Sequence, residues 1–248
     1  MNVVTEKISV AGNFRPNNED AIACCESDEK GFFWMVIADG MGGHKAGEVA
    51  SEMFVKWVKS QLQNIERENV SNWNDWLVNT VVSANLHIFN AAEEDPELNG
   101  MGTTGVILVC WQSQYYIAWV GDSRAYLLRD NQVQQVTQDH TAIQYLLDKG
   151  AISAREAKRS NTKHILARAI GIKPKVKVDV VSGSLVEGDV FLLSTDGVHD
   201  FLANKEIQAY LNQFIQGKSV TSELIDLALV NGSTDNLTFG AVKIDDLV

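Results

Sequence analysis

The chain has 248 residues, of which 45% are hydrophobic, and a formal net charge of −11. This length and apolar content are typical of one globular domain with a substantial core, and no linker or repeat divides the sequence. The acidic charge argues against nucleic acid as a partner, because a nucleic-acid-binding surface requires clustered Lys and Arg side chains. No segment has the composition of a signal peptide or of a membrane span, so the sequence predicts a soluble, cytoplasmic protein without a membrane partner. We expect it to be a monomer.

Apolar periodicity predicts a buried strand and two long helices in the first hundred residues. The run FFWMVI at 32–37 is rich in the aromatic and aliphatic residues that favour sheets. Apolar residues then recur at spacings of three and four, which predicts helices at 44–63 and at about 73–94. The second helix should end at Asp95-Pro96, because the residue before a proline disfavours helical backbone.

Short strands dominate the rest of the chain. Sheet-forming residue types recur in seven runs, at 103–110, 114–121, 124–128, 132–137, 176–183, 189–195 and 236–244. Asp130-Asn131 is a plausible hairpin turn between two of them. Helical patterns return at 204–214 and 219–230, and short helices with polar joints are expected within 141–170. Because the strands come in hairpin-like groups and the helices in pairs, the predicted class is α+β with antiparallel sheets covered by helices.

Four aspartates stand next to predicted strands. Asp39, Asp122 and Asp196 each follow an apolar run, and Asp235 precedes the last strand. Each alone is typical of an ordinary turn or helix cap. Brought together, ionised carboxylates repel one another and bind protons more tightly unless a cation neutralises them. Hard oxygen ligands without a cysteine or histidine cluster predict Mg²⁺ or Mn²⁺ rather than zinc or copper.

Two further segments add groups suited to this chemistry. Gly40, directly after Asp39, lacks a side chain, so that its backbone carbonyl can approach an ion closely. The segment 14–21 carries Glu19 and Asp20, with Arg15 four residues before Glu19. A guanidinium beside a metal pair can bind two phosphate oxygens at once. The alternative for Arg15 is a surface salt bridge in a loop.

Eight motifs follow one another along nearly the whole chain. They are R-x-x-x-E-D at 15–20, ADGMGGH at 38–44, MGTTGV at 101–106, VGDSRAYLL at 120–128, TQDHT at 137–141, LARAIG at 166–171, LLSTDGVHDFL at 192–202 and STDNLTF at 233–239. In content and order they resemble the metal-dependent PP2C-type (PPM) protein serine/threonine phosphatases, particularly the bacterial branch. The resemblance implies a single phosphatase domain over 1–248, folded as an αββα sandwich of two antiparallel sheets between helix pairs. It also implies a variable flap at about 143–168.

The resemblance assigns a role to each acidic position. It implies that Asp39 bridges two Mn²⁺ or Mg²⁺ ions, with Glu19 and the Gly40 carbonyl on one ion and Asp196 and Asp235 on the other.

A third ion is implied at Asp122, shared with Asp196. Asp20 is expected to act through ordered water, and Arg15 to hold phosphoryl oxygens. Two such ions lower the pKa of a bridging water, so that a hydroxide can attack phosphorus in line.

One position departs from the family pattern. Many eukaryotic members have a histidine, a proposed general acid, where this chain has Met41. His44 is a candidate replacement, with a helix cap as its alternative role. His140 and His199 are expected to be structural.

The implied activity is hydrolysis of phosphoserine and phosphothreonine in proteins, opposing a bacterial Ser/Thr kinase. Two alternatives are a two-metal phosphatase of small phosphorylated metabolites and an inactive relative used as a binding module. Within the flap, Arg155, Lys158, Arg159 and Lys163 form either a contact for phosphorylated substrate or an ordinary solvated helix surface.

Overall fold

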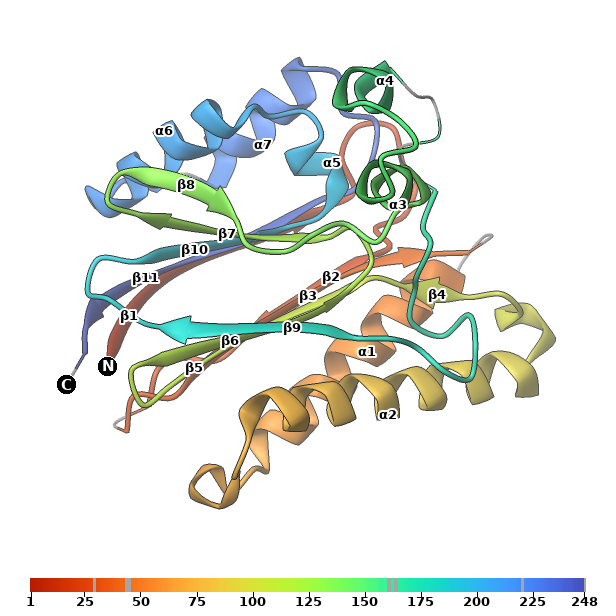
Figure 1. The fold of residues 1–248 in the computed structure, drawn as a ribbon, viewed down its shortest axis with the longest axis horizontal. Helices are drawn as coiled ribbons and strands as arrows, with labels where there is room; N and C mark the ends of the chain where they lie inside the picture. The colour runs from red at the N-terminus through yellow and green to blue at the C-terminus, as the bar shows by residue number, and fades with distance from the viewer. Residues whose placement is uncertain (29, 43–45, 160–161, 163–164, 220, 248) are drawn as a thin grey trace.

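Two antiparallel sheets pack face to face, with helices on both outer sides, in a computed structural model (Figure 1). The model describes residues 1–248 except 29, 43–45, 160–161, 163–164, 220 and 248. The first sheet has the order β1 (Asn2–Val10), β11 (Leu237–Asp246), β10 (Val190–Ser194), β7 (Arg124–Arg129) and β8 (Gln132–Gln135). The second has the order β2 (Asp20–Cys24), β3 (Phe33–Met41), β5 (Gly105–Trp111), β6 (Gln114–Val120) and β9 (Asp179–Ser184), and β4 (Gly102–Thr103) pairs with β3.

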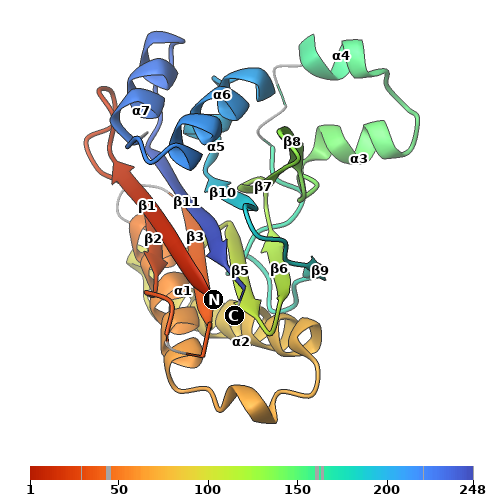
Figure 2. The same cartoon turned by 90° about the vertical axis from the view of Figure 1, so that its left-hand side faces the viewer.

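The helices form the outer layers. On the second sheet lie α1 (Ala46–Gln63) and α2 (Trp73–Glu94), and the first sheet is covered by α5 (Asp196–His199), α6 (Asn204–Ile215) and α7 (Thr221–Val230). Figure 2 shows the two helical layers on opposite sides of the sheets, with α3 (Ala142–Asp148) and α4 (Ala154–Arg159) at one end. Short 3₁₀ turns at Arg67–Asn69 and Pro96–Leu98 flank α2. No helix in the described part of the chain is long and apolar enough to cross a membrane.

Both faces of β3 are buried from Phe33 to Ala38, which explains the uninterrupted apolar run over these residues. Met35 packs in the core between the sheets, whereas Trp34 packs beneath α1 and α2. Alternate side chains of a strand point to opposite faces, so a strand covered on both sides reads as a continuous apolar run. A third core, which contains Phe239, joins the first sheet to α6 and α7.

Most predicted elements are confirmed, and the expected two-sheet sandwich is correct. The Asp130-Asn131 turn is also confirmed, since both residues have positive φ angles, of 51° and 57°. Strands β1 and β2 were not predicted, because several side chains of each are partly exposed and interrupt the apolar pattern.

The end of β3 also differs from expectation. The apolar run that predicts this strand ends at Ile37, which would leave Asp39 beyond the strand, but β3 continues through Asp39 to Met41. There it pairs with β4, with Gly40 opposite Thr103. Asp39 therefore projects from regular strand backbone.

Candidate active site

Asp39 and Asp20 are held opposite each other by the sheet. They are direct partners in the antiparallel pairing of β2 with β3. The Asp39 amide donates to Thr104 Oγ1 at 2.9 Å, and the Asp39 carbonyl accepts from the Thr104 amide at 2.8 Å and from Thr103 Oγ1 at 2.9 Å. The motif MGTTGV thus fixes the backbone of Asp39.

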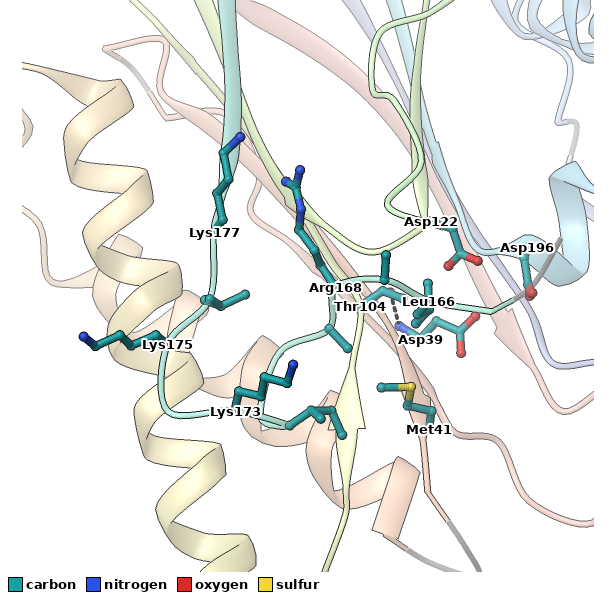
Figure 3. A pocket seen from close by; sticks show the side chains of 14 residues that line it. Asp39, Met41, Thr104, Asp122, Leu166, Arg168, Lys173, Lys175, Lys177 and Asp196 are labelled. Carbon is teal, nitrogen blue, oxygen red and sulfur yellow. Dashed lines mark hydrogen bonds between the residues drawn. The ribbon is translucent and has the colours of Figure 1, made fainter. Parts of the chain in front are cut away.

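Asp122 and Asp196 are brought together by the other sheet. Arg124 at the start of β7 pairs with Ser194 at the end of β10. Asp122 lies two residues before Arg124 and Asp196 lies two residues after Ser194, so the antiparallel register places both at the same end. Figure 3 shows Asp122 and Asp196 on the same side of one cavity as Asp39.

Asp20 links the two sheets. Its Oδ2 accepts a hydrogen bond of 2.9 Å from the hydroxyl of Thr195, which directly precedes Asp196. The Thr195 amide in turn donates to the carbonyl of Thr238 on β11. The hydroxyl of Thr195 therefore connects β2 of the second sheet to β10 and β11 of the first.

Asp235 and Glu19 are joined through Asn236. The Asn236 side chain accepts from the Glu19 amide at 2.9 Å and donates to the carbonyl of Asn17 at 2.8 Å. Arg15 Nη2 donates to Asp235 Oδ2 at 2.9 Å, and both side chains are partly exposed. The structure thus contains the salt bridge that was the alternative for Arg15, and its partner is a predicted metal ligand.

Gly40 is required by packing. A Cβ there would lie 2.1 Å from the Gly47 carbonyl oxygen and 2.6 Å from that of Glu19. The Glu19 carboxylate itself lies against Gly47 in the first turn of α1, where an added Cβ would meet Glu19 Oε2 at 2.8 Å. The two glycines thus let α1 and the Glu19 segment close onto the end of β3, a reason that the sequence alone did not reveal.

The carboxylates interact electrostatically. Burial first, and then the charges of Asp20, Asp196, Asp122 and Asp235, raise the pKa of Asp39 well above its usual value.

The pKa values of two neighbouring carboxyl groups, Asp122 and Asp20, are also raised. Burial and the Asp196 charge raise the pKa of Asp122 to about 7. Burial also raises the pKa of Asp20, against hydrogen bonds from Thr238 and Thr195 that lower it. Bound cations would relieve this cost, and carboxylate oxygens are the donors that Mg²⁺ and Mn²⁺ prefer. The residues present therefore fit such ions.

The acidic residues form an electrostatic cluster rather than a closed coordination sphere. Among the described residues, no group of three or more Asp, Glu, His or Cys side chains is arranged so that it could hold a metal ion as it stands. Glu19 and Asp235 do not line the cavity that Asp39, Asp122 and Asp196 share.

This cavity has a volume of about 550 Å³ and is acidic at one side and basic at the other (Figure 3). Met41 and Thr104 lie near the carboxylates, and the basic residues come from the segment 166–177. The motif LARAIG was recognised in the sequence, but the lysines that follow it were not predicted as site residues. Lysines at 173, 175 and 177 form a pattern in the sequence, but this pattern predicts a role in the site only once the segment is known to lie beside the carboxylates.

His140 and His199 are structural, as predicted. His140 is buried, its Nδ1 accepts from the Gly121 amide at 3.1 Å, and its Nε2 lies 3.1 Å from Asp179 Oδ2. It thereby supports the residue before Asp122. His199 is buried with its Nδ1 2.9 Å from the hydroxyl of Ser194.

Part of the predicted site lies outside the described residues. This applies to His44 and Lys163, and to the side chains of Lys158 and Arg159. Of the predicted basic flap residues, Arg155 is described, and it is exposed on α4.

Comparisons with known proteins agree with this architecture. The family model for protein phosphatase 2C matches residues 15–228. The chain is 37% identical to the serine/threonine phosphatase stp of Listeria innocua, over 92% of this chain and 90% of that protein. It is 31% identical to the protein phosphatase PhpP of Streptococcus pneumoniae, over 95% of each.

Solved structures give the same result. The serine/threonine phosphatase PstP/Ppp of Mycobacterium tuberculosis superposes with a TM-score of 0.89 at 31% identity, over 99% of this chain and 100% of that one. A catalytic domain of PstP in complex with 2 manganese ions superposes with a TM-score of 0.84 at 30% identity, over 98% and 99%. Sheets, helices and acidic cluster thus define a phosphatase of the two-sheet sandwich class. The chain belongs to the protein phosphatase 2C family, whose chemistry depends on divalent metal ions.

Proposed function

We propose that this chain hydrolyses phosphoserine and phosphothreonine in proteins. The observation that carries the proposal is the electrostatic cluster around Asp39, assembled from the ends of both sheets beside a cavity with a basic side. The relatives named as serine/threonine phosphatases support this substrate class over small phosphorylated metabolites. Every predicted acidic ligand is present in the sequence, which argues against an inactive binding module.

The proposed division of labour is the one that the family resemblance implies. Asp39 would be shared by two ions, Glu19 and the Gly40 carbonyl would hold the first, and Asp196 and Asp235 would hold the second. Two such ions supply an activated water and stabilise the charge that develops on the transferring phosphoryl group.

The remaining residues would act beside the ions. Arg15, partly exposed next to Asp235, would bind phosphoryl oxygens, and Asp20 would orient water from behind Asp39. Asp122, beside Asp196, would take part in a third site. The group that protonates the leaving oxygen is unassigned, with His44 as the candidate.

The oligomeric state, the cellular location and the partner of the protein are proposals as well. A single domain over 1–248 would act as a monomer in the cytoplasm and oppose a Ser/Thr kinase. Residues 143–168 would form the variable flap, and they include α3 and α4.

A test of the activity measures phosphate release from a phosphothreonine peptide in Mn²⁺, compared with a phosphotyrosine peptide and a sugar phosphate. We expect turnover of the phosphothreonine peptide that stops in excess EDTA. Asp39→Asn and Asp196→Asn should reduce kcat by at least about a hundredfold, because electrostatic stabilisation at the reacting group is lost.

The matched control is Asp226→Asn, which removes an exposed carboxylate on α7 and should retain full activity. Near-normal turnover in either site variant would contradict the assigned roles. Calorimetric titration with Mn²⁺ would count the ions, and Asp122→Asn should remove one weak site while the others remain.

A further inference from the structure

The cavity continues from the catalytic carboxylates to a row of lysines. Lys173, Lys175 and Lys177 line it, and they occupy alternate positions of the irregular segment between α4 and β9, in which residues 171–174 form bends. All three are exposed. Figure 3 shows the three residues across the cavity from Asp39 and Asp196, with the Lys175 side chain directed away from these carboxylates. The chain has a net charge of −11, so these lysines form a local positively charged region beside the site.

The charges of this row are largely available. Arg168, which also lines the cavity, is committed to an ion pair with Asp179 at 3.0 Å. Lys177 lies 3.6 Å from the same carboxylate, which is a weaker contact. Among the ion pairs of the described residues, none involves Lys173 or Lys175.

The backbone that carries these lysines is anchored to the core. Asn85 of α2 is buried, and its side-chain amide forms two hydrogen bonds with this backbone. Its Oδ1 accepts from the Gly171 amide at 2.8 Å, and its Nδ2 donates to the Lys173 carbonyl at 2.9 Å. A buried side chain with both functions satisfied holds its partners in one conformation.

The same segment is tied to the strand end that holds Asp39. Ile170 and Thr103 exchange two backbone hydrogen bonds, of 2.9 and 2.8 Å, and Thr103 Oγ1 donates to the Asp39 carbonyl. The positions of the lysine row and of the catalytic carboxylate are thus set by one short strand.

We propose that Lys173 and Lys175 bind acidic side chains that flank the phosphorylated residue of the substrate polypeptide. This inference rests on the proposed function. A cavity of about 550 Å³ lies within the size range of pockets that hold small ligands, and neighbouring residues of an extended peptide lie only about 3.3 Å apart along the chain. Asp or Glu side chains there would meet lysines that form no ion pair with another described residue. The remaining surface, which is predominantly acidic, would repel the same peptide.

The test compares two phosphothreonine peptides that differ only in having Glu or Gln at the flanking positions on both sides. We expect the wild-type protein to have a higher kcat/KM for the Glu peptide, mainly through KM, and the preference to shrink at high salt. Lys173→Gln combined with Lys175→Gln should reduce the preference about five- to tenfold, because each exposed pair contributes a modest energy.

A matched control carries Lys205→Gln and Lys218→Gln, which remove two exposed charges outside the cavity lining. It should keep the wild-type preference. An unchanged preference in the cavity variant, or no preference in the wild-type protein, would overturn the proposal.

A binding measurement separates this inference from the proposed function. Fluorescence anisotropy of the labelled Glu peptide in EDTA reports docking without turnover. We expect weaker binding by the cavity variant than by the wild-type and control proteins, even if no peptide is hydrolysed. Equal binding by all three would refute the docking site, and a failure of turnover alone would refute only the activity.

Discussion

Three of the candidate site aspartates, Asp39, Asp122 and Asp196, are accompanied by a hydroxyl residue that holds the scaffold. Thr104 accepts from the Asp39 amide, and its hydroxyl lies 2.6 Å from that of Ser123, the residue after Asp122. Thr195, before Asp196, donates to Asp20. These Ser and Thr residues are part of the motifs, but their oxygens are engaged by the protein. Their role is to position carboxylates. The sequence motifs alone do not distinguish residues that position carboxylates from the carboxylates themselves.

Arg15 provides a test at the scale of one residue. Its ion pair with Asp235 is partly exposed, and such pairs contribute about 0–1 kcal/mol to stability. Arg15→Ala should therefore leave the free energy of unfolding nearly unchanged, but lower kcat/KM about tenfold or more through loss of a bidentate phosphate contact. Urea unfolding and steady-state kinetics measure the two effects. If Arg15→Lys restored full activity, a point charge would suffice and the bidentate role would be wrong.

His140 gives a prediction on pH. Burial first, and then the Arg168 guanidinium, lower the pKa of His140 below its ordinary 6.5, despite the opposing effect of Asp179. Its Nδ1 faces the Gly121 amide, a donor, so a proton on that nitrogen would break the contact. The unfolded chain therefore binds the proton more readily. The stabilising contribution of neutral His140 is present above pH 6.5 and is lost as pH falls through the lower folded-state pKa.

The measurement is the free energy of unfolding between pH 7.5 and pH 5 in the wild-type protein and in His140→Asn. Asparagine keeps an oxygen near Nδ1 but does not titrate. We expect the variant to be less stable at pH 7.5 and to lose less stability on acidification. Parallel pH profiles would show that another group causes the acid sensitivity.

At the scale of elements, the closure of α1 onto β3 sets the site. Gly40→Ala would force a Cβ to within 2.1 Å of the Gly47 carbonyl oxygen, so the first turn of α1 and Glu19 must shift. We expect a loss of about 2–3 kcal/mol of stability, as for overpacked core positions, together with a loss of activity. Gly217→Ala is the control, because Gly217 has a φ of 77° but open space around it. It should cost about 1–2 kcal/mol, the cost of left-handed backbone, and leave kcat unchanged.

Buried strands could be predicted from the sequence, whereas the two N-terminal edge strands, β1 and β2, could not. The central strands β3, β5 and β10 contain long apolar runs because both of their faces are covered, and these runs are visible in the sequence alone. In β1 the polar and exposed positions mask the pattern.

The same contrast holds for the site. Asp39, Asp122 and Asp196 were identified because each follows an apolar run in the sequence. The lysine row depends on Asn85, about ninety residues away in the chain, and on the pairing of Ile170 with Thr103. Such long-range contacts leave no local pattern.

At the scale of the whole molecule, each sheet belongs to two cores at once. Phe33 and Phe191 face the core between the sheets, while Trp34 and Phe239 face the outer cores on opposite sides. Neither sheet can unfold without exposing apolar surface in the central core. We therefore expect the four layers to unfold together, as single domains commonly do.

The distribution of tryptophan makes this cooperativity measurable. All 6 tryptophans lie between residues 34 and 119, and the elements near them belong to the second sheet and to α1 and α2. Leu211→Ala on α6 creates a cavity in the opposite outer core and should cost about 2–5 kcal/mol. Leu77→Ala on α2 is the matched change on the tryptophan side. In urea, tryptophan fluorescence and far-UV circular dichroism should give one shared midpoint for each variant, with both midpoints lower than that of the wild-type protein. If Leu211→Ala lowered the circular-dichroism midpoint but left the fluorescence midpoint unchanged, α6 and its sheet would unfold separately, and the 248 residues would not form one cooperative unit.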